Sequence, residues 1–459
     1  MALKLSLRRR ELVKPTPDKV WSSHGKRWNF RHTVYDLMLS NVALGMVTPF
    51  LAVYAMALGG SNSAVGMVTA IPALINTIMY LPAASYVERQ RSRLNTSIKW
   101  WIQARLLYLA MAGVAFLPAA ELRTPTLLAI IGLQAIPTVI SNVAFTSMLG
   151  DLFPAGDRAQ LFSLRSMYGA VVTLLSSLAA GILLDEMKYP TNYAALFVIT
   201  FVAGMWALRV CRRIVEAPVE QSACRRASLW QRVGTPFKDQ HYGKQFTAFA
   251  VSAALLHLGI NISTPTIPIY YVRTLGLSNS VIGSLTLAAG LTTMLAYPLW
   301  GKVGRRSGDG AVYLASVLGL AFFPVVYGMN GAPAFLIAVQ LVSGVFTAAL
   351  NLSLLNLLLQ VVRPSDCANG IAVFNMLINA TGIIGPPIAA EIISRFGVRD
   401  ALTASTIVRL AGCIVYIAAV GPGETVRQLM AGTRAGARRM RNRMRGRGRG
   451  RNDSVREVA

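Results

Sequence analysis

The stretch Leu58–Thr69 (LGGSNSAVGMVT) returns as Leu275–Thr286 (LGLSNSVIGSLT), with seven of its twelve positions identical. A constant 217 residues separate the two copies, which is close to half of the 459-residue chain. Each copy follows one long apolar segment and opens the next. A repeat whose two copies are spaced by half the chain length, in an apolar protein, predicts a duplicated membrane bundle with a binding site between the two halves.

The composition supports a protein that crosses the membrane many times. Hydrophobic residues make up 54% of the chain and charged residues only 14%, whereas soluble proteins carry about 25% charge. We predict an all-α fold of twelve transmembrane helices in two homologous six-helix bundles with pseudo-two-fold symmetry. The expected spans are 33–57, 63–84, 98–118, 124–149, 162–184, 191–210, 245–272, 280–301, 311–330, 333–360, 367–391 and 400–420, each near the ~20 residues that a bilayer requires.

The net charge of +26 raises the possibility of nucleic-acid binding, but the distribution of the charges argues against it. We number the gaps between consecutive spans from the N-terminus, so that the long middle gap is the sixth. Of the 45 Lys and Arg residues, 38 lie at the two termini or in even-numbered gaps, and five lie in odd-numbered gaps. Basic residues concentrate on the cytoplasmic side of membrane proteins. We therefore expect a multi-pass protein of the cytoplasmic membrane with both termini inside the cell, and no nucleic-acid partner.

The chain divides into five parts. We expect a basic cytoplasmic segment over residues 1–32, a first bundle over 33–210, a cytoplasmic linker over 211–244, a second bundle over 245–420 and an Arg-rich disordered tail over 421–459. We favour contact with anionic lipid over RNA binding for the tail, because each basic residue near a membrane surface contributes about 1 kcal/mol of attraction. The four cysteines have no metal-site spacing, and we expect no cofactor, no metal and a monomer.

Together, the twelve spans, the duplicated halves and two loop motifs resemble the major facilitator superfamily. Residues 301–308 (GKVGRRSG) are similar to that family's loop signature in Gly301, Arg306 and Gly308, although Arg305 stands at the acidic position. A weaker copy, residues 84–91 (ASYVERQR), offers Glu88 and Arg89 as the acidic-basic pair. The resemblance implies that these loops gate the cytoplasmic face, and that the first, fourth, seventh and tenth helices line the pore.

Polar residues at membrane depth are the candidates for substrate contact, because they are costly there without a role. His257 and Asn261 are four residues apart and share a helix face. For each candidate, the alternative is a hydrogen bond that joins helices, worth ~0.6 kcal/mol on average. The full set is Asn41, Gln134, Asn142, His257, Asn261, Gln340, Asn351, Asn375 and Asn379.

Charged residues inside the spans are the candidates for coupling or gating. Asp36 and Arg105 both lie near the cytoplasmic side, and we favour a static pair over a proton-linked switch. For Arg165, at the start of the fifth span, contact with an anionic substrate and capping of the gate are both open. Arg409 lies in the middle of the last span, and Glu391 is its nearest candidate partner.

We favour a secondary transporter of a small molecule working by alternating access, with a slight preference for efflux of amphipathic or drug-like compounds. No acidic residue lies at the centre of a span, so coupling to protons would depend on Asp36 or His257. An uptake permease for a neutral metabolite and a non-transporting sensor or partner subunit are the alternatives. An enzyme is not expected, because no nucleophile-base pair, metal cluster or phosphate loop is present in the sequence.

Overall fold

A computed structural model describes residues 22–152, 155–216, 242–362 and 367–420. The predicted Arg-rich tail lies outside the described residues, as do residues 1–21 of the basic N-terminal segment and 217–241 of the linker. Every regular element in the described part of the chain is a helix.

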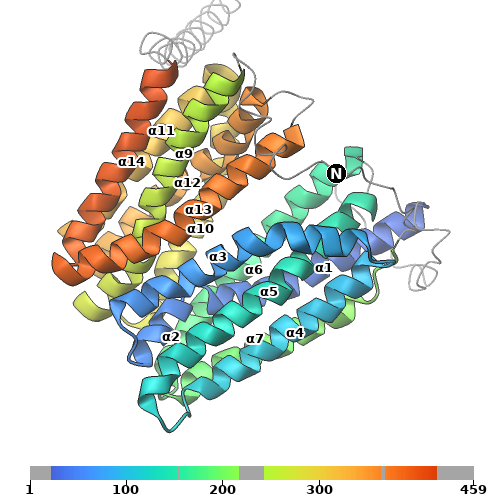
Figure 1. The fold of residues 1–459 in the computed structure, drawn as a ribbon, viewed down its shortest axis with the longest axis horizontal. Coiled ribbons are helices and arrows are strands. Elements are labelled where there is room, and N and C mark those ends of the chain that lie inside the picture. The colour runs from blue at the N-terminus through green and yellow to red at the C-terminus, as the bar shows by residue number, and fades with distance from the viewer. Residues whose placement is uncertain (1–21, 153–154, 217–241, 363–366, 421–459) are drawn as a thin grey trace, which may run out of the picture.

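The helices form two bundles that lie side by side (Figure 1). The first bundle consists of α1 (Ser23–Val47), α2 (Leu51–Ala57), α3 (Asn62–Glu88), α4 (Arg93–Val114), α5 (Ala120–Leu152), α6 (Ala155–Glu186) and α7 (Thr191–Cys211). The second consists of α9 (Tyr242–Ile269), the π-helix η4 (Tyr270–Thr274), α10 (Asn279–Ser307), α11 (Asp309–Met329), α12 (Pro333–Val361), α13 (Cys367–Arg395) and α14 (Val398–Val420).

The first helix is longer than expected, and it is interrupted. It begins at Ser23 rather than residue 33, because the side chain of Ser22 caps it by accepting a hydrogen bond of 3.1 Å from the amide of Gly25. It breaks at residues 48–50, where Pro49 has no amide hydrogen to donate, and continues as α2. The first two elements therefore act as one interrupted span.

The repeated sequence forms the same turn in both halves. Gly59 and Gly276 have φ of +87° and +63°, a backbone region that glycine enters without steric cost. Two residues later, Ser61 and Ser278 are extended and start α3 and α10. Two of the seven identical positions of the repeat are thus explained by a helix ending and the next helix beginning.

A third conserved position of the repeat lets the halves approach each other. A Cβ atom on Gly66 of α3 would lie 3.0 Å from the carbonyl oxygen of Pro386 on α13. The equivalent glycine of α10, Gly283, lies against α6, where a Cβ would be 2.8 Å from the carbonyl oxygen of Ser177. Small residues allow such close backbone packing between membrane helices. The two bundles therefore meet through α3 with α13 and α6 with α10.

The helices of both bundles begin and end at two opposite ends of the molecule. The repeat end contains residues 58–62 and 273–280, where α3 and α10 begin. The termini end contains the start of α1 and the end of α14.

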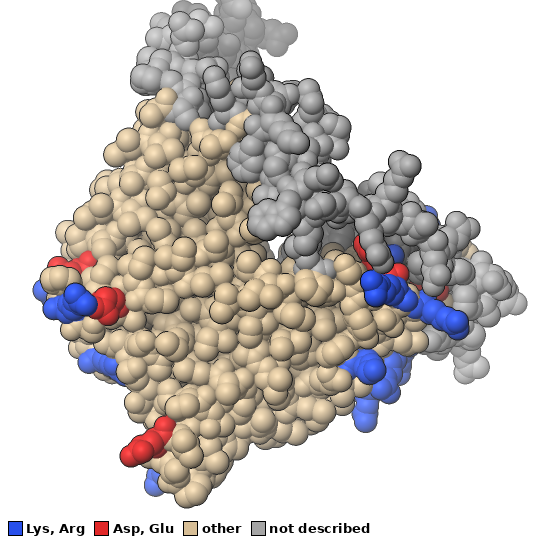
Figure 2. Space-filling model, viewed as in Figure 1, with Lys and Arg blue, Asp and Glu red and all other residues tan. Residues whose placement is uncertain are grey.

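Eleven helical segments in the described residues are long and apolar enough to cross a membrane. The one predicted span that falls short of that criterion is the third, which corresponds to α4 and carries Lys99 and Arg105. It nevertheless runs the length of the first bundle between α5 and α7. Charged side chains gather toward the ends of the molecule, and a broad uncharged band separates them (Figure 2). This distribution is that of a multi-span membrane protein.

Candidate substrate-transport site

Two candidates of the first bundle join helices to each other. Asn41 of α1 accepts a hydrogen bond of 2.9 Å from the hydroxyl of Thr173 on α6, while its amide donates to the carbonyl oxygen of Leu37. Gln134 of α5 donates to the carbonyl oxygen of Ala104 on α4 at 3.1 Å. Both side chains are half-buried. These contacts fit the helix-joining alternative, because they satisfy polar groups that the bilayer would leave unpaired.

His257 and Asn261 lie on one face of α9 but make separate contacts. Nδ1 of His257 lies 2.8 Å from the carbonyl oxygen of Ala253, one turn earlier in the same helix. The amide of Asn261 donates to the hydroxyl of Thr381 on α13, at 2.9 Å. Asn261 therefore ties α9 to α13, and His257 is held against its own backbone.

The candidates of α12 take part in two different contacts. Gln340 lies 3.5 Å from the hydroxyl of Tyr271 and accepts a hydrogen bond of 3.1 Å from Ser343. Asn351, nearer the termini end, donates to the hydroxyl of Tyr297 on α10 at 3.2 Å and is itself exposed.

Four amides are exposed at a similar depth, and three helices contribute them. Asn142 and Asn351 each precede the last residue of their helix by ten positions. Asn375 and Asn379 follow the first residue of α13 by eight and twelve. At 1.5 Å per residue, this places all four roughly 12–18 Å from the termini end.

An amide at this depth is costly to expose to lipid, because nothing there satisfies its hydrogen bonds. Water between the halves would satisfy them. Asn142, Asn351, Asn375 and Asn379 therefore remain candidates for substrate contact, and all four are exposed at this depth.

Arg105 lies deep inside the first bundle and links three helices. It is 7% exposed and donates to the carbonyl oxygen of Gly204 on α7 and, at 3.1 Å, to the hydroxyl of Ser40 on α1. Its guanidinium carbon lies 5.4 Å from the ring centroid of Trp101. Asp36 of α1, which is 1% exposed, interacts electrostatically with Arg105. The two predicted partners therefore do lie together in the protein interior.

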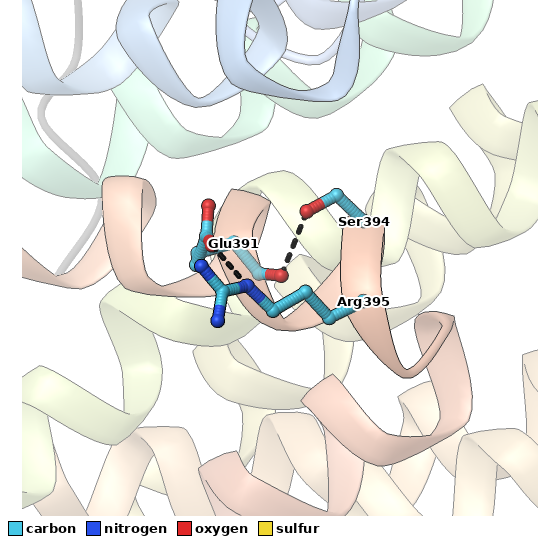
Figure 3. A network of polar contacts seen from close by, with 3 residues as sticks. All are labelled: Glu391, Ser394 and Arg395. Atoms are coloured by element: carbon cyan, nitrogen blue, oxygen red, sulfur yellow. Dashed lines mark hydrogen bonds and ion pairs between the residues drawn. The ribbon is translucent and has the colours of Figure 1, made fainter.

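The predicted pair between Arg409 and Glu391 is wrong. Arg409 is 6% exposed and donates to the carbonyl oxygen of Leu320 on α11 at 2.7 Å and to the hydroxyl of Ser263 on α9 at 2.8 Å. Glu391 instead pairs with Arg395, one turn further along α13, and both side chains are exposed (Figure 3). An exposed partner four residues away requires no burial of the carboxylate, which explains the preference.

The two buried arginines occupy related places in the duplicated fold. Arg105 extends from the third span of the first half toward the first and sixth. Arg409 extends from the sixth span of the second half toward its first and third. In each half, one guanidinium therefore joins the first, third and sixth spans. The arginine lies on the third span in the first half and on the sixth span in the second half.

The predicted gating residues lie at the termini end. Glu88, Arg89 and Arg306 are all exposed, and the side chain of Arg165 lies outside the described part of α6. The acidic group that the loop motif lacks at Arg305 is found four residues later. Asp309, the first residue of α11, accepts hydrogen bonds from the amides of Asn356 at 3.0 Å and Gln360 at 2.8 Å, both on α12.

Glu216, after the end of α7, was not identified from the sequence. Its carboxylate accepts from the hydroxyl of Ser92 at 2.5 Å and from the amides of Arg93 and Leu94 at 2.6 and 3.2 Å. An acidic group is favourable at a helix N-terminus, where amides have no partner within the helix. Glu216 therefore fastens the start of the linker to α4.

Two charged residues at the repeat end were also missed, and both contact the opposite half. Arg273 of η4 donates to the side chain of Asn62 and to the carbonyl oxygen of Gly60. Asp185 near the end of α6 accepts from the amides of Asn279 and Ser280 and from the side chain of Asn279, at 2.7–2.9 Å. The repeat was the available signal, since both contacts fall on its two copies.

Among the described residues, no group of three His, Cys, Asp or Glu side chains lies close enough together to hold an ion. Both Cys211 and Cys413 are buried.

Comparison with known proteins identifies the family. A family model described as Major Facilitator Superfamily matches residues 37–241 and 249–445. A protein of Staphylococcus aureus (strain NCTC 8325 / PS 47), named staphyloferrin B transporter, is 26% identical over 161 residues, which are 34% of this chain and 38% of that protein. The matched segment thus spans well under half of that relative.

Solved structures share the fold at low sequence identity. The nucleoside transporter NupG superposes with a TM-score of 0.67 at 13% identity, covering 85% of this chain and 98% of its own. A bacterial homologue of the human lysosomal transporter Spinster, inward-facing and unoccupied, gives 0.62 at 14% identity, covering 88% and 98%. A POT family transporter in complex with a thioalcohol-conjugated peptide gives 0.64 at 13% identity, covering 89% and 99%.

Proposed function

Because this chain belongs to the major facilitator superfamily, whose members are transporters, we propose that it is a secondary active transporter that exports an amphipathic small molecule by alternating access. One observation carries the proposal. The halves are joined across the repeat end, while exposed amides occupy three helices toward the termini end. This is the arrangement expected of one of the two states of such a transporter.

The chemistry of the lining supports an uncharged or amphipathic substrate. We assign the four exposed amides, Asn142, Asn351, Asn375 and Asn379, to the lining of a space between the halves that opens toward the termini end. Amides donate and accept hydrogen bonds without carrying a charge. The surrounding spans are apolar, so the substrate would combine hydrogen-bonding groups with an apolar body. Staphyloferrin B, for which the relative from Staphylococcus aureus is named, belongs among the first compounds to test.

Orientation and energy source complete the proposal. The distribution of Lys and Arg supports a cytoplasmic-membrane protein whose termini end faces the cytoplasm, with the basic tail near anionic lipid and the protein as a monomer. The substrate space would then be open to the inside, as export requires for loading. If protons drive transport, Asp36 is the candidate carrier with a buried basic partner.

The test is transport in proteoliposomes. The purified protein, reconstituted with a proton gradient, should move a fluorescent amphipathic cation or staphyloferrin B at a rate that empty vesicles do not show. The substitutions Asn142→Ala and Asn379→Ala should raise KM several-fold, whereas Asn330→Ala, at the repeat end, should leave it unchanged. Movement only in the inward direction would indicate the uptake permease, and ligand binding without movement would indicate a sensor.

A further inference from the structure

We propose that the repeated sequence forms a two-part latch that closes the repeat end, with each copy held by a charged side chain from the opposite half. Arg273, in the second half, binds Gly60 and Asn62 of the first copy. Asp185, in the first half, binds Asn279 and Ser280 of the second copy. The proposal rests on the proposed function in one respect, since a latch matters only if this end opens.

The two parts of the latch engage the same positions of the repeat. Asn62 and Asn279 are equivalent residues, and each is contacted across the halves by a charged group. The equivalent glycines Gly66 and Gly283, one turn further on, bring the same helices into close contact with the other half. Conserved positions of the repeat thus serve the interface between the halves as well as the turn.

The first helical turns of α3 and α10 differ in how they are capped. The hydroxyl of Ser61 accepts a hydrogen bond of 3.2 Å from the amide of Ala64, so α3 caps itself. Ser278, the equivalent of Ser61, makes no such bond and lies 3.0 Å from the hydroxyl of Ser280. Asp185 supplies the missing acceptor for α10, and its negative charge is favourable at that helix N-terminus.

Opening the repeat end would therefore have a specific cost. The amides of Asn279 and Ser280 would lose their acceptor, and the guanidinium of Arg273 would leave its two oxygen partners. Both charged side chains are exposed, which weakens each contact through solvent screening. We expect each half of the latch to change the ratio of closed to open states about fivefold, and both together about 25-fold if they act independently.

The experiment measures distances and requires no substrate. Nitroxide labels at Leu122→Cys and Phe396→Cys, which lie on opposite halves at the repeat end and are 59% and 69% exposed, would report its opening by double electron–electron resonance. The four native cysteines are replaced by alanine in this background. Asp185→Asn and Arg273→Gln should each raise the ratio of the longer-distance to the shorter-distance population about fivefold relative to the parent.

Matched controls separate a latch from a general effect of charge. Glu186→Gln removes the acidic group next to Asp185, and Arg399→Gln removes an exposed arginine at the same end. Both should leave the distances unchanged. If Asp185→Asn and Arg273→Gln also leave them unchanged, the latch is overturned. Should either variant fold poorly, Asn62→Ala and Asn279→Ala, which each remove one uncharged side chain of the latch, must give a smaller shift in the same direction.

Hydrogen exchange on the unlabelled protein provides a second measurement. Asp185→Asn should accelerate exchange in the peptide that begins α10 but not in the peptide that begins self-capped α3. A shift in distances without any transport would retain the latch and refute the proposed function. Transport with unchanged distances would refute the latch alone.

Discussion

Exchanging each buried arginine for methionine should have unequal consequences for stability in the two halves. Arg105→Met leaves the carboxylate of Asp36, which is 1% exposed, without the guanidinium that lies near it. Removing one partner of a buried charge pair costs about 3–5 kcal/mol. We expect the variant to lose that amount of stability and to melt on the order of 5 °C lower.

Arg409→Met should be nearly neutral. Its two hydrogen bonds are lost, but Ser263 retains a bond of 2.6 Å to Ser405. Nε of Arg409 has no hydrogen-bond partner among the described residues, so part of the guanidinium is buried without compensation. An arginine in mid-membrane costs ~2.5–3.5 kcal/mol, similar to the two charged bonds that it makes. The net change should lie within about 1 kcal/mol.

The native cysteines supply the assay. Cys211 and Cys413 are buried, so a dye that fluoresces on reaction with thiols reports their exposure as the protein unfolds on heating. Cys224 and Cys367 are changed to serine in every sample. The double variant Asp36→Asn with Arg105→Met should recover about 2 kcal/mol, because neither charge then remains.

Equal losses of Tm in Arg105→Met and Arg409→Met would refute this reasoning. That result would mean that the hydrogen bonds, rather than the charge pair, decide the stability of each three-helix cluster. Failure of the double variant to recover would likewise show that Asp36 does not depend on Arg105.

Three further changes test other contacts. Gly283→Val should slow transport and favour an open repeat end by label distances, because its Cβ would approach the carbonyl oxygen of Ser177 to 2.8 Å; a faster transporter would contradict this. Glu216→Gln should lower the Tm by an amount corresponding to about 1 kcal/mol through weaker capping of α4, with unchanged KM; a change in KM would place Glu216 in the substrate path. Asn261→Ala should cost ~0.6 kcal/mol through loss of its bond to Thr381, and loss of ligand binding without loss of stability would return Asn261 to the site.

The fold could be predicted because its signals are local or periodic. Apolar runs of the right length and the repeat led to two six-helix bundles, which the family match and the structural neighbours confirm. The early start of α1 was missed, because its cap at Ser22 precedes the apolar run. Hydropathy locates the segment that lies in lipid, and helices continue beyond it.

The site was harder to predict because its contacts join distant parts of the chain. Whether Asn261 binds Thr381 or a substrate depends on a residue 120 positions away. The assignment of Glu391 to Arg409 failed because it was based on the depth of the two residues in the membrane. Glu391 instead pairs with Arg395, which lies four residues later in the same helix. Asp36 and Arg105 were expected to be near each other because both lie inside spans that few other charges enter, and the two do interact electrostatically.

The unequal capping of the two repeat copies has a consequence for biosynthesis. The first half of the chain is synthesised before the second, so α3 must begin to form before any residue of the second half is present. Ser61 meets that need within its own turn. By the time α10 emerges, Asp185 has already been made and inserted, and the second copy can use an acceptor from its predecessor. The duplicated sequence is therefore divided by order of synthesis into a copy that folds alone and a copy that is completed on the first.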